Sequence, residues 1–263
     1  MGILNLTPDS FYEGSRCSGE EQALIMAERY VEEGADILDL GAESTRPGAK
    51  PITAAEELER LLPVLTRLRR KVAVPVSVDT YKPEVAEIVL AEGAQIINDV
   101  TGLQKYPDMA KTIARFNASV VIMHMKGTPD TMQDDTRYED LFGEIVAYLQ
   151  KSVKIAEEAG IDPEKISVDP GLGFGKTCAD NLALIAGLRR FEVLDKPILL
   201  GASRKSFIGK VLGGISASER LEGSLATAIF GALNGASVLR VHDVGPTVNA
   251  LKVIGAIQAE TAR

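Results

Sequence analysis

Residues 76–99 read VSVDTYKPEVAEIVLAEGAQIIND and hold one complete repeat of the pattern that decides the fold. The apolar run Val76–Val78 predicts a buried strand. Pro83 suits the first position of a helix, and Gly93 suits its C-terminal stop because glycine readily takes the left-handed conformation. The next apolar run, Ile96–Ile97, predicts a second strand, so strand, helix and strand follow one another directly.

The same alternation of a short apolar run and a longer amphipathic stretch continues along the whole chain. Eight runs predict strands: Gly2–Leu6, Ile37–Leu40, Val76–Val78, Ile96–Ile97, Val120–Met123, Ile166–Val168, Ile198–Leu200 and Val238–Val241. Most of them do not alternate with polar residues, which indicates strands buried on both faces of a parallel sheet. Eight such units predict an α/β protein with a single (β/α)8 TIM barrel over residues 1–263; an open doubly wound sheet is the alternative.

The stretches between the strands carry signals for helix starts and stops. Capping-box patterns open three of them, at residues 18–21, 53–56 and 216–219. The longest helical stretch begins near Tyr138 and stops at Gly160, and the last runs from about Thr247 to Ala262. Pro63 lies inside the helix expected after residue 53 and should bend or divide it.

Composition and charge exclude several classes of protein. The 263 residues include 29 basic and 37 acidic side chains, a net charge of −8, so no nucleic-acid or anionic-membrane partner is expected. No apolar run approaches the ~18 residues of a membrane span, and no signal peptide is recognised. Cys17 and Cys178 form neither a disulfide framework nor a zinc spacing, so the cytoplasm is the expected compartment.

The active site of such a barrel forms at the carboxyl ends of the strands. Each strand is expected to deliver a polar side chain to this rim: Asn5, Asp39, Asp79, Asn98, Asp99, His124, Asp169, Ser203, Arg204, Lys205, Ser206, Arg240 and His242. Ionised carboxylates only accept hydrogen bonds, whereas asparagine both donates and accepts. Asp79, Asp169 and Asn98 together therefore suit the edge of an amino-pyrimidine, which offers N–H donors and one carbonyl.

Positive charge gathers after the last two predicted strands. Arg204 and Lys205 follow the seventh strand, and Arg240 and His242 belong to the eighth. Barrels often bind phosphate at this place, so the four side chains predict a phosphate-binding corner. His124 is interpreted instead as a rim histidine with a protein partner.

Three loops on the same rim have unusual sequences. Residues 169–177 are rich in glycine, but a Walker motif would need glycine where Pro170 stands, so we expect a wall that a flat ligand can approach closely. The connections 7–18 and 41–52 are long for strand-to-helix loops and are candidates for lids. Phe11 would place an aromatic ring on the first of them.

Eight motifs at these strand ends resemble those of the dihydropteroate synthases. In chain order they are MGILNLTPDSF (1–11), GAESTRPGA (41–49), VDTYKPEV (78–85), INDV (97–100), MHMKGTP (123–129), DPGLGFGK (169–176), SRKSFIG (203–209) and RVHDV (240–244). That family joins 6-hydroxymethyl-7,8-dihydropterin pyrophosphate to p-aminobenzoate, releasing pyrophosphate and forming 7,8-dihydropteroate for folate biosynthesis. The resemblance also implies a Mg²⁺ ion, a cytoplasmic homodimer and inhibition by sulfonamides.

The resemblance implies a role for each matching residue. The pterin ring would be held by Asp79, Asn98, Asp169 and Lys205. The pyrophosphate would be held by Asn5, Arg240 and His242, with Thr45 beside it and Asn5 near the Mg²⁺. The p-aminobenzoate pocket would be lined by Phe11, Pro47, Phe174, Lys205 and Ser206, while Asp9 and Arg46 order the two long loops. The catalytic residues of this set would be Asp9, Lys205, Arg240 and His242.

Two departures from the family pattern concern these loops. Residues 12–17 read YEGSRC where Ser-Asp-Gly-Gly is more usual, and Ala42 stands where a second glycine is usual. Two other functions remain as alternatives. A methyltransferase of the related pterin-binding barrels would share the pterin residues but gives no reason for the motifs at 44–48 and 203–206. The other alternative is a pterin-binding protein without catalytic activity.

Overall fold

The computed structural model describes residues 1–7, 19–44 and 48–261, and within them eight parallel strands close into a barrel. The strands are β1 (Gly2–Asn5), β2 (Leu38–Gly41), β3 (Val76–Asp79), β4 (Ile96–Asp99), β5 (Ser119–Met123), β6 (Ile166–Asp169), β7 (Ile198–Leu200) and β8 (Ala236–Leu239). Each strand pairs in parallel with the next along the chain. The ring closes because Gly2 bridges Val241 and the Ile3 N–H donates to the Val241 carbonyl at 2.9 Å.

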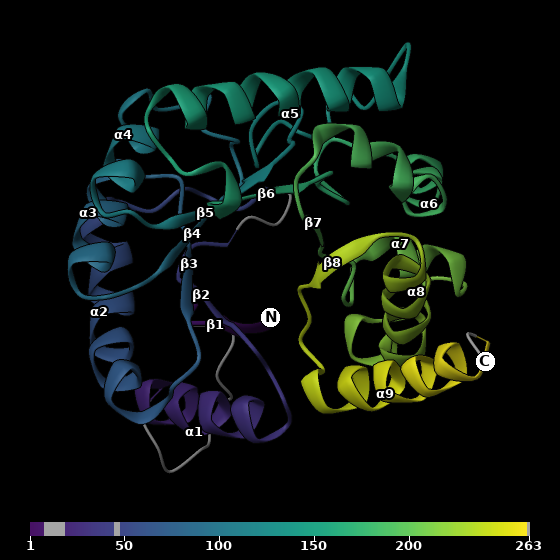
Figure 1. Ribbon diagram of the computed structural model, residues 1–263, viewed down its shortest axis with the longest axis horizontal. Coiled ribbons are helices and arrows are strands. Elements are labelled where there is room, and N and C mark those ends of the chain that lie inside the picture. Colours follow the sequence, from purple (N-terminus) through teal and green to yellow (C-terminus); the bar gives the residue numbers. More distant parts are fainter. Residues whose placement is uncertain (8–18, 45–47, 262–263) are drawn as a thin grey trace.

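Helices form an outer layer around this ring of strands (Figure 1). They are α1 (Gly19–Glu32), α2 (Ala54–Lys71), α3 (Pro83–Ala91), α4 (Asp108–Arg115), α5 (Leu141–Glu158), α6 (Cys178–Ala186), α7 (Ser206–Val211), α8 (Leu221–Leu233) and α9 (Val244–Thr261). Short 3-10 helices lie at η2 (Pro163–Lys165), η3 (Leu188–Leu194) and η4 (Ala217–Glu219). Followed from purple to yellow in Figure 1, the helices pass once around the barrel. The predicted (β/α)8 TIM barrel is confirmed.

The start of α2 shows how local sequence sets a helix boundary. The Thr53 side chain accepts from the Glu56 N–H at 3.2 Å, and the Glu56 carboxylate accepts from the Thr53 N–H at 2.8 Å, so the capping box is confirmed. Of the two outcomes expected of Pro63, a bend or a division, the division does not occur, because α2 continues unbroken to Lys71. Pro63 is exposed, so water can satisfy the carbonyl that has lost its helical partner.

The remaining signals for helix starts are those at Ser18, Pro83 and Ser216. The capping box at Ser216–Glu219 is present, but it starts the 3-10 helix η4, and α8 begins only at Leu221. The first pattern begins at Ser18, which lies outside the described residues. Pro83 stands at the first position of α3, as predicted. In the part of the chain that the structure describes, no helix is both long and apolar enough to cross a bilayer.

The core lies on both faces of the strands, as the apolar runs predicted. Val78, Ile97 and Ile122 have no exposed surface, and burial of such side chains contributes about 1.5–3 kcal/mol each. The eighth strand is Ala236–Leu239, two residues upstream of the predicted run, and its pairing with β7 contains a register shift at Ile198 and Leu199. Arg240 and His242 therefore lie beyond the end of β8, on the rim.

Candidate functional site

Strand register brings the first group of predicted residues to one level of the rim. Asn5 pairs with Gly41, Gly41 with Asp79, and Asp79 with Asn98. Asn98 is 4% exposed, so its amide is nearly removed from solvent. A side chain at Gly41 would place its Cβ 3.6 Å from Asn5 Oδ1 and 3.8 Å from Asp79 Cβ. Glycine therefore leaves the space between these two side chains open.

Arg240, the residue after β8, contacts carboxylates of β2 and β3. Its guanidinium lies 2.6 Å from Asp39 Oδ2 and 3.0 Å from Asp79 Oδ2. Asp39 has no exposed surface, so the arginine compensates a fully buried carboxylate on β2 and a second one on β3. Burial and the nearby Asp39 carboxylate raise the pKa of Asp79, whereas the Arg240 guanidinium opposes that rise. Arg240, a member of the predicted phosphate-binding corner, therefore contacts Asp79, a predicted pterin acceptor.

Asp169 ends β6, and Lys205 lies in the loop after β7, near enough for their charges to interact. Asp169 is 4% exposed, and its Oδ1 accepts from the Gly171 N–H at 2.7 Å. Burial raises the pKa of Asp169, and the Lys205 ammonium works against that rise. Burial lowers the pKa of Lys205 to about 8, with Asp169 opposing the change. A Cβ at Gly201 would lie 3.8 Å from Asp169 Oδ2 and 4.0 Å from Arg240 Cβ, so Asp169 borders the same floor.

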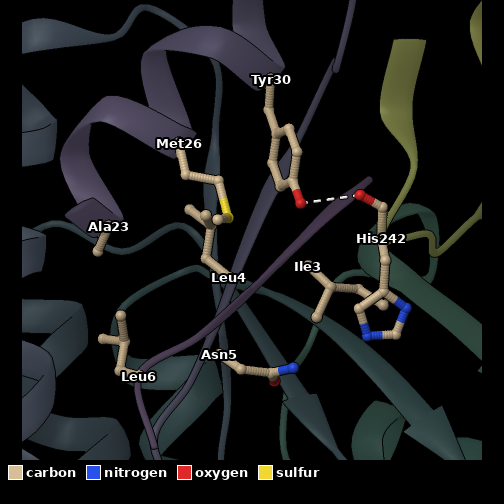
Figure 2. A pocket seen from close by; sticks show the side chains of 8 residues that line it. All are labelled: Ile3, Leu4, Asn5, Leu6, Ala23, Met26, Tyr30 and His242. Atoms are coloured by element: carbon tan, nitrogen blue, oxygen red, sulfur yellow. Dashed lines mark hydrogen bonds between the residues drawn. The ribbon is translucent and has the colours of Figure 1, made fainter. Parts of the chain in front are cut away.

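His242 lies where the chain passes from β8 into α9. Its Nδ1 is 3.1 Å from Ser203 Oγ, which also accepts from the His242 N–H at 3.2 Å. The Tyr30 hydroxyl of α1 donates to the His242 carbonyl at 2.8 Å. Figure 2 shows this bond beside a pocket between β1 and α1 that Asn5 and His242 both line. The segment that follows the last strand is therefore joined directly to the first helix at the site.

One wall of the rim is apolar. Tyr81, Val100, Met123, Met125 and Met132 form a buried cluster apart from the main core, and Phe174 packs against it. The Lys205 ammonium lies 4.7 Å from the centre of the Phe174 ring, an arrangement that cation–π attraction stabilises. The sequence analysis did not predict this wall. Met123 and Met125, which flank His124 at the end of β5, could have indicated it, because residues at the carboxyl end of a strand lie on the rim.

A second feature that the sequence did not reveal is a buried lysine. Lys176 is 3% exposed; its ammonium lies 2.9 Å from His124 Nδ1 and donates to the Phe174 carbonyl at 3.0 Å. Burial lowers the pKa of Lys176 to about 7, and burial together with Lys176 lowers that of His124 to about 2. The interpretation of His124 as a histidine with a protein partner is confirmed. The pair fixes the backbone that carries Phe174.

The pKa of Lys176 predicts how stability changes with pH. The unfolded chain holds this proton up to about pH 10.4, whereas the folded chain releases it near pH 7. Between these values the unfolded state binds more protons, so the free energy of unfolding rises with pH. Lys176→Met removes this contribution, which is on the order of 1 kcal/mol per pKa unit.

Urea unfolding at pH 7 and pH 9 measures the effect. The rise in the free energy of unfolding should be smaller in Lys176→Met than in the parent protein. Lys151→Met is the matched control, because Lys151 is exposed on α5 and should leave the rise unchanged. An equal rise in all three proteins would show that Lys176 keeps its proton in the folded state.

The side chains of two rim residues, Asp99 and Arg204, bind other parts of the protein and do not face the site. Asp99 accepts from the Thr101 N–H at 2.7 Å and the Leu103 N–H at 2.9 Å, which holds the turn after β4. The prediction that Arg204 belongs to the phosphate corner is wrong. Its guanidinium binds Asp243, with Nε 2.8 Å from Oδ2 and Nη2 2.7 Å from Oδ1.

Ser206, a predicted site residue, is exposed at the first position of α7.

The base of the second long loop is anchored by charge. Lys82 donates to the carboxylates of Glu43 and Glu57, and the Tyr81 hydroxyl donates to Glu43 Oε1 at 2.6 Å. Glu43 thus fastens the loop after β2 to the segment between β3 and α3. The predicted loop residues lie outside the described residues, so their roles stay predictions: Asp9, Phe11, Thr45, Arg46 and Pro47.

Comparison with known proteins agrees with this geometry. A family described as "Pterin binding enzyme" matches residues 1–242. Dihydropteroate synthase from Escherichia coli (strain K12) is 44% identical, with 97% of this chain and 90% of the relative covered. The Bacillus subtilis (strain 168) enzyme is 43% identical, with 98% and 87% covered.

Solved structures match equally well. Xanthomonas albilineans dihydropteroate synthase with 4-aminobenzoic acid has a TM-score of 0.92 and 45% identity, covering 98% of this chain and 92% of that one. The Yersinia pestis synthase in a sulfonamide drug complex has a TM-score of 0.92 and 40% identity, covering 98% and 93%. Fold and site thus define an enzyme of the pterin-binding barrel class. Within that class the chain belongs to the dihydropteroate synthases, transferases of folate biosynthesis.

Proposed function

We propose that this rim condenses a pterin pyrophosphate with p-aminobenzoate, and that three strand ends hold the pterin. Asp79 and Asp169 would accept from the amino and ring N–H groups, while Asn98 both donates and accepts. Asn98 and Asp169 are buried and Asp79 is partly buried, which supports this role, because hydrogen bonds to a ligand are worth more where water is excluded. The apolar wall that carries Phe174 would lie against the flat ring.

Lys205 and Ser206 would serve the second substrate. The Lys205 ammonium donates to the Leu172 carbonyl and lies over the Phe174 ring. Ser206 is exposed at the start of α7, where a carboxylate would meet a hydroxyl and a lysine. The Xanthomonas albilineans synthase structure that contains 4-aminobenzoic acid supports this substrate class.

The diphosphate would be bound by Arg240, His242 and Asn5. As the bond from the pterin methylene to the diphosphate oxygen breaks, negative charge grows on the leaving group, and the guanidinium and imidazole stabilise it. The aniline nitrogen of p-aminobenzoate forms the new bond to that carbon and loses one proton. The main support for this proposal is the position of Arg240: its contacts with Asp39 and Asp79 place the cation beside Asp79, one of the pterin acceptors.

A Mg²⁺ ion fits this site only as a companion of the diphosphate. In the described ranges no group of three or more His, Cys, Asp or Glu side chains could hold a metal. Asn5 offers one amide oxygen, which suits a hard ion that takes its remaining oxygens from phosphate and water. The ion would supply charge neutralisation at the diphosphate when bound.

Competition between a sulfonamide and p-aminobenzoate tests the second half of the site. We expect sulfonamide to raise the apparent KM for p-aminobenzoate without lowering kcat at saturating p-aminobenzoate, because both ligands carry an aniline and an anionic end. The sulfonamide complex of the Yersinia pestis synthase supports this expectation. Steady-state rates over a grid of both ligands measure it; normal turnover at saturating sulfonamide and low p-aminobenzoate would defeat it.

We further propose a cytoplasmic homodimer whose protomer is one domain over residues 1–263. Large apolar side chains are exposed on the last helices: Val211 and Leu212 near α7, Phe230 and Leu233 on α8, and Val253 and Ile257 on α9. Such side chains gathered over neighbouring helices are typical of a surface that a second copy covers. Cys178 is a free thiol, which suits a reducing compartment. Sedimentation at micromolar concentration tests the dimer.

A further inference from the structure

Arg204 joins the loops that follow β7 and β8. Its Nε and Nη2 meet the two carboxylate oxygens of Asp243 at 2.8 Å and 2.7 Å, a two-point contact between planar groups. The side chains are only 27% and 19% exposed, so solvent screens the pair weakly. The remaining nitrogen, Nη1, donates to the carbonyls of Ala217 and Ser218. Every nitrogen of the guanidinium therefore donates to a protein oxygen.

The backbone of Arg204 is held in an unfavourable conformation. Its φ is 56°, in the left-handed region where a side chain other than glycine costs of order 1 kcal/mol. Two contacts hold it there: the Arg204 N–H donates to Ser224 Oγ at 2.9 Å, and its carbonyl accepts from Arg220 at 2.9 Å. Strain of this kind persists only where several contacts fix the geometry, and it often marks a functional site.

The Asp243 side chain binds Arg204, although its position directly before α9 would suit a helix cap. It immediately precedes α9, where an aspartate ordinarily accepts from N–H groups of the first turn. Both of its carboxylate oxygens accept from Arg204 instead, and the Gly245 N–H donates to Glu33, the residue after the end of α1, at 3.0 Å. Because Glu33 accepts from the first turn of α9, the Asp243 carboxylate is left for the arginine.

The two ends of this ion pair adjoin residues of the site. Ser203 precedes Arg204, His242 precedes Asp243, and Ser203 Oγ contacts both the N–H and Nδ1 of His242. Lys205 is anchored separately, because its ammonium contacts the Leu172 carbonyl and the Phe174 ring across the barrel. Loss of the Arg204 contact should therefore disturb the imidazole more than the pterin acceptors.

We propose that Arg204 and Asp243 form a positioning pair that orients His242 toward the diphosphate half of the substrate. The inference rests on the proposed function, since it assigns the diphosphate to His242. Arg204 touches no substrate in this account; it acts through the two loops that it joins. The chemistry it serves is recognition of a diphosphate, whether as part of the pterin substrate or as the released product.

Binding of two separate probes distinguishes positioning from general stability. Inorganic pyrophosphate with Mg²⁺ should bind about ten-fold more weakly to Arg204→Met, since small misplacements of a binding group are costly. Pteroic acid, which lacks the diphosphate, should change by less than about two-fold. The same split should appear in turnover, with a higher KM for the pterin pyrophosphate and an unchanged KM for p-aminobenzoate. Arg204→Lys should restore part of the loss, because lysine keeps the charge but not the two-point contact.

A matched control separates the loss of any ion pair from the loss of this one. Arg67 of α2 contacts Glu20 and Glu21 of α1 at 2.7 Å and 3.0 Å on the outer layer, so Arg67→Met should leave both affinities unchanged. Asp243→Asn provides a second variant should Arg204→Met fail to fold, with the same split expected. Equal loss of both probes, or pyrophosphate affinity like that of Arg67→Met, would overturn the proposal. Failure of the parent protein to make dihydropteroate would instead overturn the proposed function.

Discussion

Asp169→Asn is expected to weaken the binding of pteroic acid by roughly 100-fold. The substitution keeps the shape of the side chain and an oxygen for the Gly171 N–H, but it replaces the other acceptor oxygen with a donor. A ligand N–H that met a carboxylate would then face an N–H, and a buried unpaired donor costs about 1–3 kcal/mol, more where a charged partner is lost. Isothermal titration of the folded variant measures the affinity.

Asp195→Asn is the control for this substitution. Asp195 is exposed and precedes β7, at the opposite end of the barrel from the rim. The same chemical change should therefore leave pteroic acid affinity unaltered there. Because burial raises the pKa of Asp169, removing its charge should not lower the free energy of unfolding strongly. Unchanged affinity in Asp169→Asn would show that the pterin does not use this carboxylate.

Arg240→Met is expected to lower both stability and activity severely. It leaves Asp39, which has no exposed surface, and Asp79 without their shared cation. Removing one partner of a buried ion pair typically costs about 3–5 kcal/mol, so the urea midpoint should fall sharply. Turnover should fall as well, because the variant loses the cation that faces the leaving group.

The pH dependence of this variant has a definite sign. Burial raises the pKa of Asp79 to about 7 although Arg240 opposes the rise, so without the arginine the folded protein should hold this proton to a higher pH. The free energy of unfolding of the variant should then keep falling as pH rises above about 7, where the contribution of Asp79 in the parent levels off. The double variant Asp39→Asn with Arg240→Met should recover part of the loss. Parent-like stability of Arg240→Met at pH 7 would contradict the contacts described for the floor of the rim.

The rim was predictable because register in a parallel barrel is a property of the strands themselves. Once Val76–Val78 and Ile96–Ile97 are recognised as neighbouring buried strands, Asp79 and Asn98 must meet at the same end. The eighth strand was less predictable, because its apolar residues continue past the last paired position. The run to Val241 therefore placed the end of β8 two residues late.

Side-chain direction at a loop could not be predicted from the sequence. Arg204 and Lys205 are adjacent basic residues, yet one turns to Asp243 and the other to the Phe174 ring. The difference comes from the left-handed backbone at Arg204, which no sequence period encodes. The pairing of Lys176 with His124 joins loops that are 52 residues apart, and only the closed barrel brings them together.

The most direct test of the account is turnover by the purified chain. The protein is incubated with 6-hydroxymethyl-7,8-dihydropterin pyrophosphate, p-aminobenzoate and Mg²⁺, and both products are quantified. We expect equimolar 7,8-dihydropteroate and pyrophosphate, with the rate falling in Arg240→Met and Asp169→Asn. Binding of the pterin pyrophosphate without either product would contradict it and would favour a pterin-binding protein or a different pterin enzyme.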